Sequence, residues 1–296
     1  MTMRVVRGEK SPLLNENLVF AGKTPLKQQD AIISGSYVEI AGEKFYQIGQ
    51  YDQMRPFFMS VVSGGDHWLF ISSKGGLTAG RTNADSALFP YETEDKLTMH
   101  GETAGSKTIF LVEQDAKTYL WEPFSERFGG AYQLERNLYK NVYGNKLIFE
   151  ELNLDLGLTF RLMWRTGERF GFIKSSTIVN QGEACQIAVL DGLLNVLPYG
   201  ASDSTQNRLS NLLNAYKRSE LDEETGLGIF TMSATLTDLA EPSESLKATV
   251  VWQTGLKDVI YLLCQEQVEQ FRLGEYVEQE VDVLGKAGAY LVRSGF

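Results

Sequence analysis

A stretch of alternating apolar and polar residues in the middle of the chain restricts the folds that this sequence can adopt. Between residues 147 and 199, one run places its apolar residues at every second position: Leu158, Phe160, Leu162 and Trp164. This is the period of a strand with one buried face. Turn-forming residues close the runs at 155–157, 166–167 and 180–182. We therefore expect consecutive runs to pair as antiparallel neighbours in a large β-sandwich.

Hairpin patterns continue on both sides of this stretch. Strand-like runs at 37–40 and 44–48 are separated by Ala41, Gly42 and Glu43, and further pairs occupy 57–62 with 67–72 and 107–112 with 118–121. Strand patterns return at 228–236, 246–252 and 259–264. Only residues 202–218 carry apolar residues at helical spacing, behind Ser202, Asp203 and Ser204 as candidate N-caps. The sequence thus predicts an all-β protein with one or two short helices, since residues 265–296 fit either strand or helix.

The chain divides into a short arm and one large domain. Residues 1–30 are polar and irregular, with a candidate edge strand at 13–20, and we expect them to lie across the surface. Residues 31–296 show no low-complexity linker and no repeat, which favours a single β domain. The sequence stops just after the strand-like run GAYLVRSGF. We expect the chain to be the N-terminal part of a longer protein.

Charge and hydropathy argue against two classes of partner. The 28 basic and 38 acidic residues give a net charge of −10, and no basic cluster exceeds a pair, so nucleic acid and anionic membranes are not expected partners. No run has the roughly 18 to 20 apolar residues of a membrane helix, and the first residues lack the apolar core of a signal peptide. The predicted location is the cytoplasm.

Metal and cofactor signatures are not found in the sequence. Cys185 and Cys264 lie in apolar strand-like runs and are interpreted as small buried residues. His67 and His100 are the only histidines and have no partner at metal-ligand spacing, so neither a metal site nor a cofactor is predicted. His67 adjoins Trp68 in a predicted strand, which favours a structural imidazole.

Five residues form the predicted carbohydrate-binding set. A polar, glycine-rich loop is predicted at 72–96, and loops of this length in compact domains are often functional. It contains Arg81, Asn83 and Asp85, while Trp121 and Glu122 lie in a second aromatic segment. Sugars need polar partners for their hydroxyls and an aromatic surface for their apolar face. The alternatives are purely structural roles: loop-stabilising hydrogen bonds for the first three residues and ordinary core packing for Trp121.

The order of three segments resembles the N-terminal domain of the cellobiose phosphorylase-like glycoside phosphorylases and their glycosidase relatives. The resemblance spans roughly residues 57–200 and rests on structural motifs: Gly75-Gly76, Tyr143-Gly144, Leu158-Thr159-Phe160 and Ile178-Val179-Asn180. It implies a large antiparallel β-supersandwich of the galactose mutarotase-like kind. In that family the sandwich packs against a C-terminal helical barrel that carries the catalytic acid, and no part of this sequence corresponds to such a barrel.

The resemblance leads to three functional hypotheses. The first is a non-catalytic module that binds an oligosaccharide or sugar and packs against the helical barrel of a larger glycoside phosphorylase or hydrolase, with the loop from Gly75 to Tyr91 reaching the site. The second is a structural or oligomerisation module without ligand, such as a homodimer. The third is a stand-alone mutarotase-like epimerase, which would have to use His67 or His100 with a carboxylate.

Overall fold

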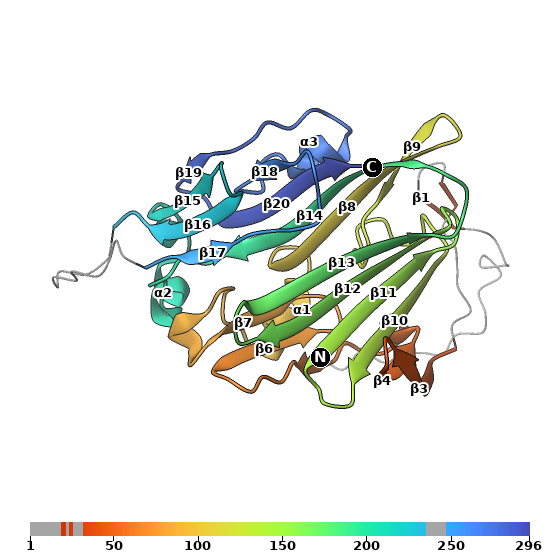
Figure 1. Cartoon of the computed structure of the whole chain (residues 1–296), viewed down its shortest axis with the longest axis horizontal. Helices are drawn as coiled ribbons and strands as arrows, with labels where there is room; N and C mark the ends of the chain where they lie inside the picture. The colour runs from red at the N-terminus through yellow and green to blue at the C-terminus, as the bar shows by residue number, and fades with distance from the viewer. Residues whose placement is uncertain (1–18, 22–23, 26–31, 235–246) are drawn as a thin grey trace, which may run out of the picture.

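The computed structural model describes residues 19–21, 24–25, 32–234 and 247–296, and these are mostly antiparallel β-structure. The arm predicted at 1–30 therefore falls largely outside the described residues. Within it, β1 (Phe20–Ala21) and β2 (Thr24–Pro25) pair with each other. Figure 1 shows the four larger sheets set around the middle of the molecule.

The two largest sheets contain six and five strands. The six-stranded sheet has the order β13-β12-β11-β10-β4-β3 and consists of β3 (Ser34–Ile40), β4 (Glu43–Gly49), β10 (Leu134–Asn141), β11 (Lys146–Asn153), β12 (Leu158–Gly167) and β13 (Gly171–Asn180). The five-stranded sheet has the order β18-β20-β14-β8-β9 and consists of β8 (Gly105–Gln114), β9 (Lys117–Trp121), β14 (Gln186–Val196), β18 (Ile260–Leu262) and β20 (Gly288–Gly295).

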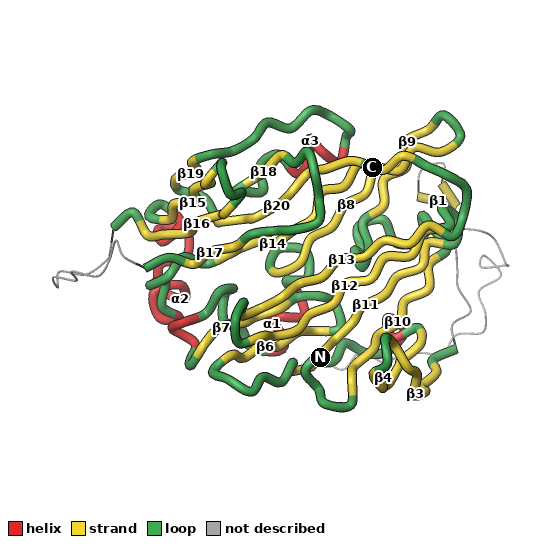
Figure 2. The backbone as a smooth tube through the Cα atoms, in the orientation of Figure 1, coloured by secondary structure: helices red, strands yellow, loops and turns green. Residues whose placement is uncertain are grey.

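Two smaller sheets and a few short helices complete the described structure (Figure 2). The four-stranded sheet contains β15 (Lys217–Asp222), β16 (Leu227–Met232), β17 (Thr249–Val251) and β19 (Asp282–Leu284), and the three-stranded sheet contains β5 (Phe58–Ser60), β6 (His67–Ser72) and β7 (Leu77–Arg81). The helices are α1 (Glu94–Met99), α2 (Asp203–Asn214), α3 (Val268–Arg272) and the 3₁₀ helices η1 (Tyr51–Gln53) and η2 (Ala84–Ser86). None of the described helices is long and apolar enough to cross a bilayer.

Most of the predicted local structure is confirmed. The meander β11-β12-β13 pairs in consecutive antiparallel order, and the hairpins β5-β6 and β8-β9 form at the predicted places. The predicted helix is α2, and the Ser202 hydroxyl accepts a hydrogen bond from the Thr205 amide as its N-cap. The hairpin β3-β4 has a two-residue turn, Ala41-Gly42, and not the three residues predicted.

The meander prediction is wrong for its last run. The chain leaves β13 after Asn180 and crosses to the other large sheet, where β14 pairs with β8 and β20. The reason is that β14 carries apolar residues toward both faces. Val189 belongs to the main core and Leu190 to a second core on the opposite face. A strand that is apolar on both faces is stabilised between two partners in a covered sheet.

The prediction of one long loop at 72–96 is wrong, because this segment contains β7, η2 and the start of α1. Strand β7 was missed because its three central residues, Thr78, Ala79 and Gly80, are small. A Cβ atom on Gly80 would lie 2.5 Å from the indole of Trp68 and 2.8 Å from the backbone of Ala87. Close packing on both sides therefore requires a residue that has low β propensity.

One core joins the four larger sheets. It takes residues from each of them, including Leu69 of β6, Phe110 of β8, Phe160 of β12 and Phe230 of β16. A second core fills the space between the five-stranded sheet and α3, where Ile109 and Phe271 are buried. Cys264 is buried and Cys185 is half-buried, and neither forms a disulfide.

Candidate functional site

The three predicted loop residues lie together at the end of β7 and make bonds within the protein. Arg81 is exposed and binds the carboxylate of Asp66 through its Nε and Nη2 atoms, at 3.1 and 2.9 Å. The Asn83 side chain caps η2 by accepting from the Asp85 amide. The Asp85 carboxylate accepts from the Asp203 amide at 3.0 Å, at the start of α2. These bonds fasten the loop to β6 and to α2.

Trp121 lies in the main core and is 1% exposed. Its ring packs against Phe110, with a centroid separation of 5.2 Å. Its Nε1 donates a 2.7 Å hydrogen bond to the fully buried carboxylate of Glu151, which also accepts from the Phe124 amide and from Arg136. Both faces of the indole are covered, so a sugar could stack on it only if the core opened.

Glu122 belongs to a buried ion cluster beneath α3. Its carboxylate pairs with Lys107 of β8 at 2.7 Å and with Arg272 of α3, and all three side chains are nearly inaccessible to water. Burial alone would raise the pKa of Glu122. The hydrogen bonds and charges of Arg272 and Lys107 outweigh burial and hold the pKa below its ordinary value. The role that the structure supports for Glu122 is to fasten α3 to the five-stranded sheet.

The five predicted residues therefore form two separate groups. Among the described residues, no hydrogen bond or ion pair joins the loop group, Arg81, Asn83 and Asp85, to the core group, Trp121 and Glu122. Carbohydrate binding by either group stays a prediction. The observed contacts match the structural alternatives, which are loop-stabilising hydrogen bonds for the loop group and core packing for Trp121.

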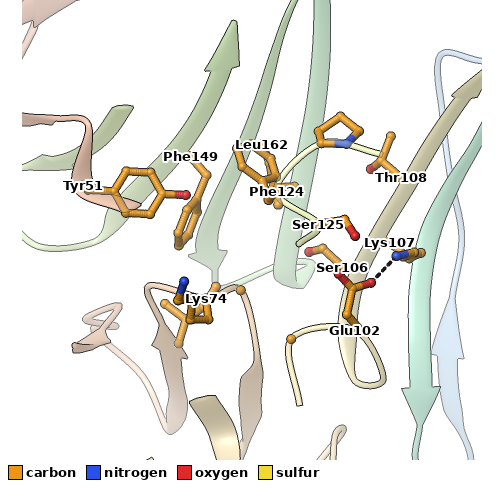
Figure 3. A pocket seen from close by; sticks show the side chains of 14 residues that line it. Tyr51, Lys74, Glu102, Ser106, Lys107, Thr108, Phe124, Ser125, Phe149 and Leu162 are labelled. Atoms are coloured by element: carbon orange, nitrogen blue, oxygen red, sulfur yellow. Dashed lines mark hydrogen bonds and ion pairs between the residues drawn. The ribbon is translucent and has the colours of Figure 1, made fainter. Parts of the chain in front are cut away.

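A narrow cavity with a mixed lining lies beside the core group, where three sheets meet (Figure 3). Lys74, Glu102, Lys107 and Ser125 are among its lining side chains, and Lys107 pairs with Glu102 at 2.5 Å. Its volume is about 40 Å³, which is room for one or a few water molecules. Ligand sites for small molecules usually have several hundred Å³, so this cavity is too small for a sugar ring.

A larger groove lies at the edge of the six-stranded sheet and has a volume of about 350 Å³. One wall of the groove consists of cross-strand neighbours on one face of β3, β4 and β10. Tyr37 lies opposite Tyr46, and Tyr46 lies opposite Lys140. Its other wall comes from Phe57 and Met59, in and before β5. Ile48, Leu138, Asn141 and Val142 complete the lining.

Two tyrosine rings dominate this tyrosine groove, which we define by its nine lining residues. Tyr37 is 62% exposed and Tyr46 is 44% exposed, and their rings meet edge to face at 5.2 Å. Adjacent exposed aromatic rings that form one apolar surface are typical of ligand-binding grooves and contact sites. The adjacent hydroxyls and the Lys140 ammonium add polar groups at the margin of the rings. This combination can bind a flat molecule that has one apolar face and polar edges.

The charge in the tyrosine groove is positive. Burial lowers the pKa of Lys140, and no hydrogen bond or ion pair within the described part of the chain reaches its ammonium group. Lys44 lies over the Tyr37 ring, 4.2 Å from its centroid. None of the lining residues is acidic. The groove is therefore locally cationic in a chain with net charge −10.

A second aromatic surface covers the outer face of the three-stranded sheet. Phe58, Phe70 and Trp68 stack in a row, with centroid separations of 5.2 and 5.9 Å, and Tyr91 meets Trp68 edge to face. We call these four residues the aromatic strip. Phe58 and Tyr91 are exposed, and Trp68 and Phe70 are half-buried. None of the four residues lines the narrow cavity or the tyrosine groove.

The two histidines lie in different surroundings. The His67 side chain is buried against Phe172, 3.7 Å from the Asp66 carboxylate, whereas His100 is partly exposed beyond α1 and pairs with Glu92. Neither histidine lines the narrow cavity or the tyrosine groove. Within the described ranges, no cluster of three or more His, Cys, Asp or Glu residues could hold a metal ion.

The residues of the tyrosine groove were not singled out by sequence reasoning. The signal was present in part, because a two-residue turn at Ala41-Gly42 places Tyr37 directly opposite Tyr46. Lys140 lies in β10, which was not predicted as a strand because the segment is rich in aromatic and polar residues. Comparison of the chain with protein-family models and with curated proteins found no match.

Proposed function

We propose that this chain is a non-catalytic carbohydrate-binding and domain-packing module of a larger cytoplasmic carbohydrate-active enzyme, of the glycoside phosphorylase or hydrolase type. The proposal includes a β-supersandwich fold for residues 31–296, which the shared core of the four larger sheets supports. One observation carries the binding role. The tyrosine groove combines a volume of about 350 Å³, two exposed tyrosine rings and polar groups at their margin.

The aromatic strip supports the domain-packing role. Its four rings form a continuous apolar row on the outside of the three-stranded sheet, and Tyr91 ends the loop that begins at Gly75. Rows of exposed aromatic residues are typical of surfaces that contact another domain or protein. In the proposed enzyme, the partner of the strip is a C-terminal helical barrel.

Titration of a panel of oligosaccharides by calorimetry or NMR tests the binding role. We expect a dissociation constant in the millimolar range, about 4 kcal/mol of binding free energy, because a shallow groove desolvates little of the sugar. Tyr46→Ala should weaken binding severalfold, since it removes one ring from the wall. Tyr276→Ala is the matched control, because Tyr276 is exposed and lies outside the groove. Equal affinities for the two variants, or no binding to the wild-type chain, would contradict the proposal.

A structural or oligomerisation module is the second candidate, and the aromatic strip also favours it. A homodimer that buries the strip would dissociate when Phe58 and Tyr91 are replaced by lysine. Sedimentation velocity over a wide concentration range checks this directly. A wild-type chain that stays monomeric throughout would count against the second candidate.

The epimerase hypothesis has the least support. Its acid and base must both reach one substrate, and the two histidines lie outside the two cavities described above. Epimerisation of aldoses by the wild-type chain, lost in both His67→Ala and His100→Ala, is the result that would revive it.

A further inference from the structure

Lys140 is the one charged residue in the lining of the tyrosine groove. In the sheet it lies between Tyr46 of β4 and Leu147 of β11, and its side chain is on the same face as the buried Leu138. A Cβ atom added to Gly144 would lie 3.7 Å from the Lys140 Cε, so the turn after β10 lies close to the aliphatic part of the side chain. The side chain is half-buried at the groove.

This ammonium group has no counter-charge among the described residues. No ion pair or hydrogen bond reaches it there, and partial burial destabilises its charged form. Glu39, an acid on the same sheet face, is the cross-strand neighbour of Lys44 and makes no ion pair within the described residues. Lys107 and Lys174, in contrast, pair with Glu122 and Asp191. Lys217 is buried in β15 and also makes no ion pair within the described residues, but it lines neither cavity. Lys140 is therefore the unpaired cation that a ligand in the tyrosine groove would meet.

We infer that the tyrosine groove selects a saccharide that carries an anionic substituent, a carboxylate or a sulfate or phosphate ester, with Lys140 binding the anion and the tyrosine rings contacting the sugar face. This inference rests on the proposed carbohydrate-binding function and names the ligand class of the same site. Lys44, over the Tyr37 ring, adds a second positive charge beside the groove, so a longer anionic chain that extends past Tyr37 would meet a second cation.

The test compares charged and neutral forms of the same sugar. The probes are trigalacturonate, its fully methyl-esterified form, and a sulfated disaccharide with its unsulfated parent, each titrated at low salt. The wild-type chain should bind at least one charged form about tenfold more tightly than its neutral counterpart, the size expected for one hydrogen bond to a charged group. Whether the uronate or the sulfate shows this preference identifies the source of the anion.

Three variants locate the effect. Lys140→Gln should lower the affinity for the charged form to that of the neutral form and leave the neutral form unchanged. Lys140→Arg should restore the preference, because it keeps the charge. Lys117→Gln is the control, since Lys117 is exposed at the start of β9 and makes no ion pair within the described residues. Thermal unfolding of each variant checks that the fold is retained.

The possible outcomes distinguish failure of the inference from failure of the proposed carbohydrate-binding function. If wild type binds the charged and neutral forms equally, or if Lys140→Gln keeps the full preference, the inference is wrong while carbohydrate binding stands. If the wild-type chain binds none of the four probes and no neutral oligosaccharide of the panel, the proposed function and the inference both fail.

Discussion

Trp121 and Glu122 are consecutive residues whose side chains point to opposite sides of the five-stranded sheet. Trp121 enters the main core beside Phe110, and Glu122 meets Lys107 and Arg272 under α3. Alternation along a strand therefore gives the two neighbours unrelated environments. A sequence motif that pairs an aromatic residue with a carboxylate resembles a sugar site, yet within a strand the pair cannot face one ligand.

At the residue scale, Glu122→Gln tests the ion cluster. The substitution removes the counter-charge that Lys107 and Arg272 share, while Lys107 keeps Glu102 and Arg272 keeps Glu269 as partners. We therefore expect a loss of about 1.5–3 kcal/mol in the free energy of unfolding at pH 7, the size of a hydrogen bond to a charged group. Urea denaturation measures it, and Glu183→Gln, at an exposed acid, is the control. A loss no larger than that of the control would show that the cluster adds nothing to stability.

The same cluster predicts a pH dependence. The pKa of Glu122 is lower in the folded than in the unfolded chain, because Arg272 and Lys107 favour its ionised form despite burial. The stabilisation is therefore complete above the unfolded pKa of about 4.3 and is lost as pH falls through the folded value. The difference in stability between wild type and Glu122→Gln should narrow steadily below about pH 4.3. A difference that stays constant or grows in acid would contradict this assignment.

At the scale of single elements, the length of one turn decides whether the tyrosine groove can be foreseen. A three-residue turn at 41–43 would place Tyr37 opposite Gln47. The observed two-residue turn, with Ala41 and Gly42 both at positive φ, places Tyr37 opposite Tyr46. A shift of one residue in the pairing of two strands moves a side chain to the other face of the sheet. The register therefore has to be known before a site on one face can be predicted from the sequence.

Periodicity predicted the strands whose two faces differ and failed where they do not. The run of β12 alternates clearly, and its pairing with β11 and β13 follows from the turns on either side. Strand β14 is apolar toward both faces, and the three central residues of β7 are small, so neither shows the pattern of a half-buried strand. Their places depend on packing partners distant in sequence, which local patterns do not contain.

Asp85 provides a prediction at this scale, because it joins η2 to α2. Its carboxylate accepts from the Asp203 amide, and a negative charge at a helix N-terminus is favourable. We expect Asp85→Ala to destabilise the protein by about 0.5–1 kcal/mol, as loss of a cap does. It should also speed hydrogen exchange in the first turn of α2. Glu224→Ala, at an exposed acid elsewhere, is the control, and unchanged exchange in α2 would contradict the assigned role.

At the scale of the whole molecule, the shared core predicts cooperative unfolding. Side chains from all four larger sheets meet in it, so no sheet can lose its packing alone. We expect tryptophan fluorescence and far-ultraviolet circular dichroism to report one coincident transition in urea. Two separated transitions would mean that residues 31–296 contain independent folding units and would refute the single-domain proposal.

The proposed function depends on where a sugar binds, and an amide NMR titration with the tightest-binding oligosaccharide of the panel measures that directly. We predict that the largest shift changes fall on the β3-β4 hairpin around Tyr37 and Tyr46 and on residues 138–142, with little change at Trp121 or along the aromatic strip. Shift changes centred on the aromatic strip or on the loop around Arg81, with the tyrosine groove unaffected, would contradict the assignment of the site.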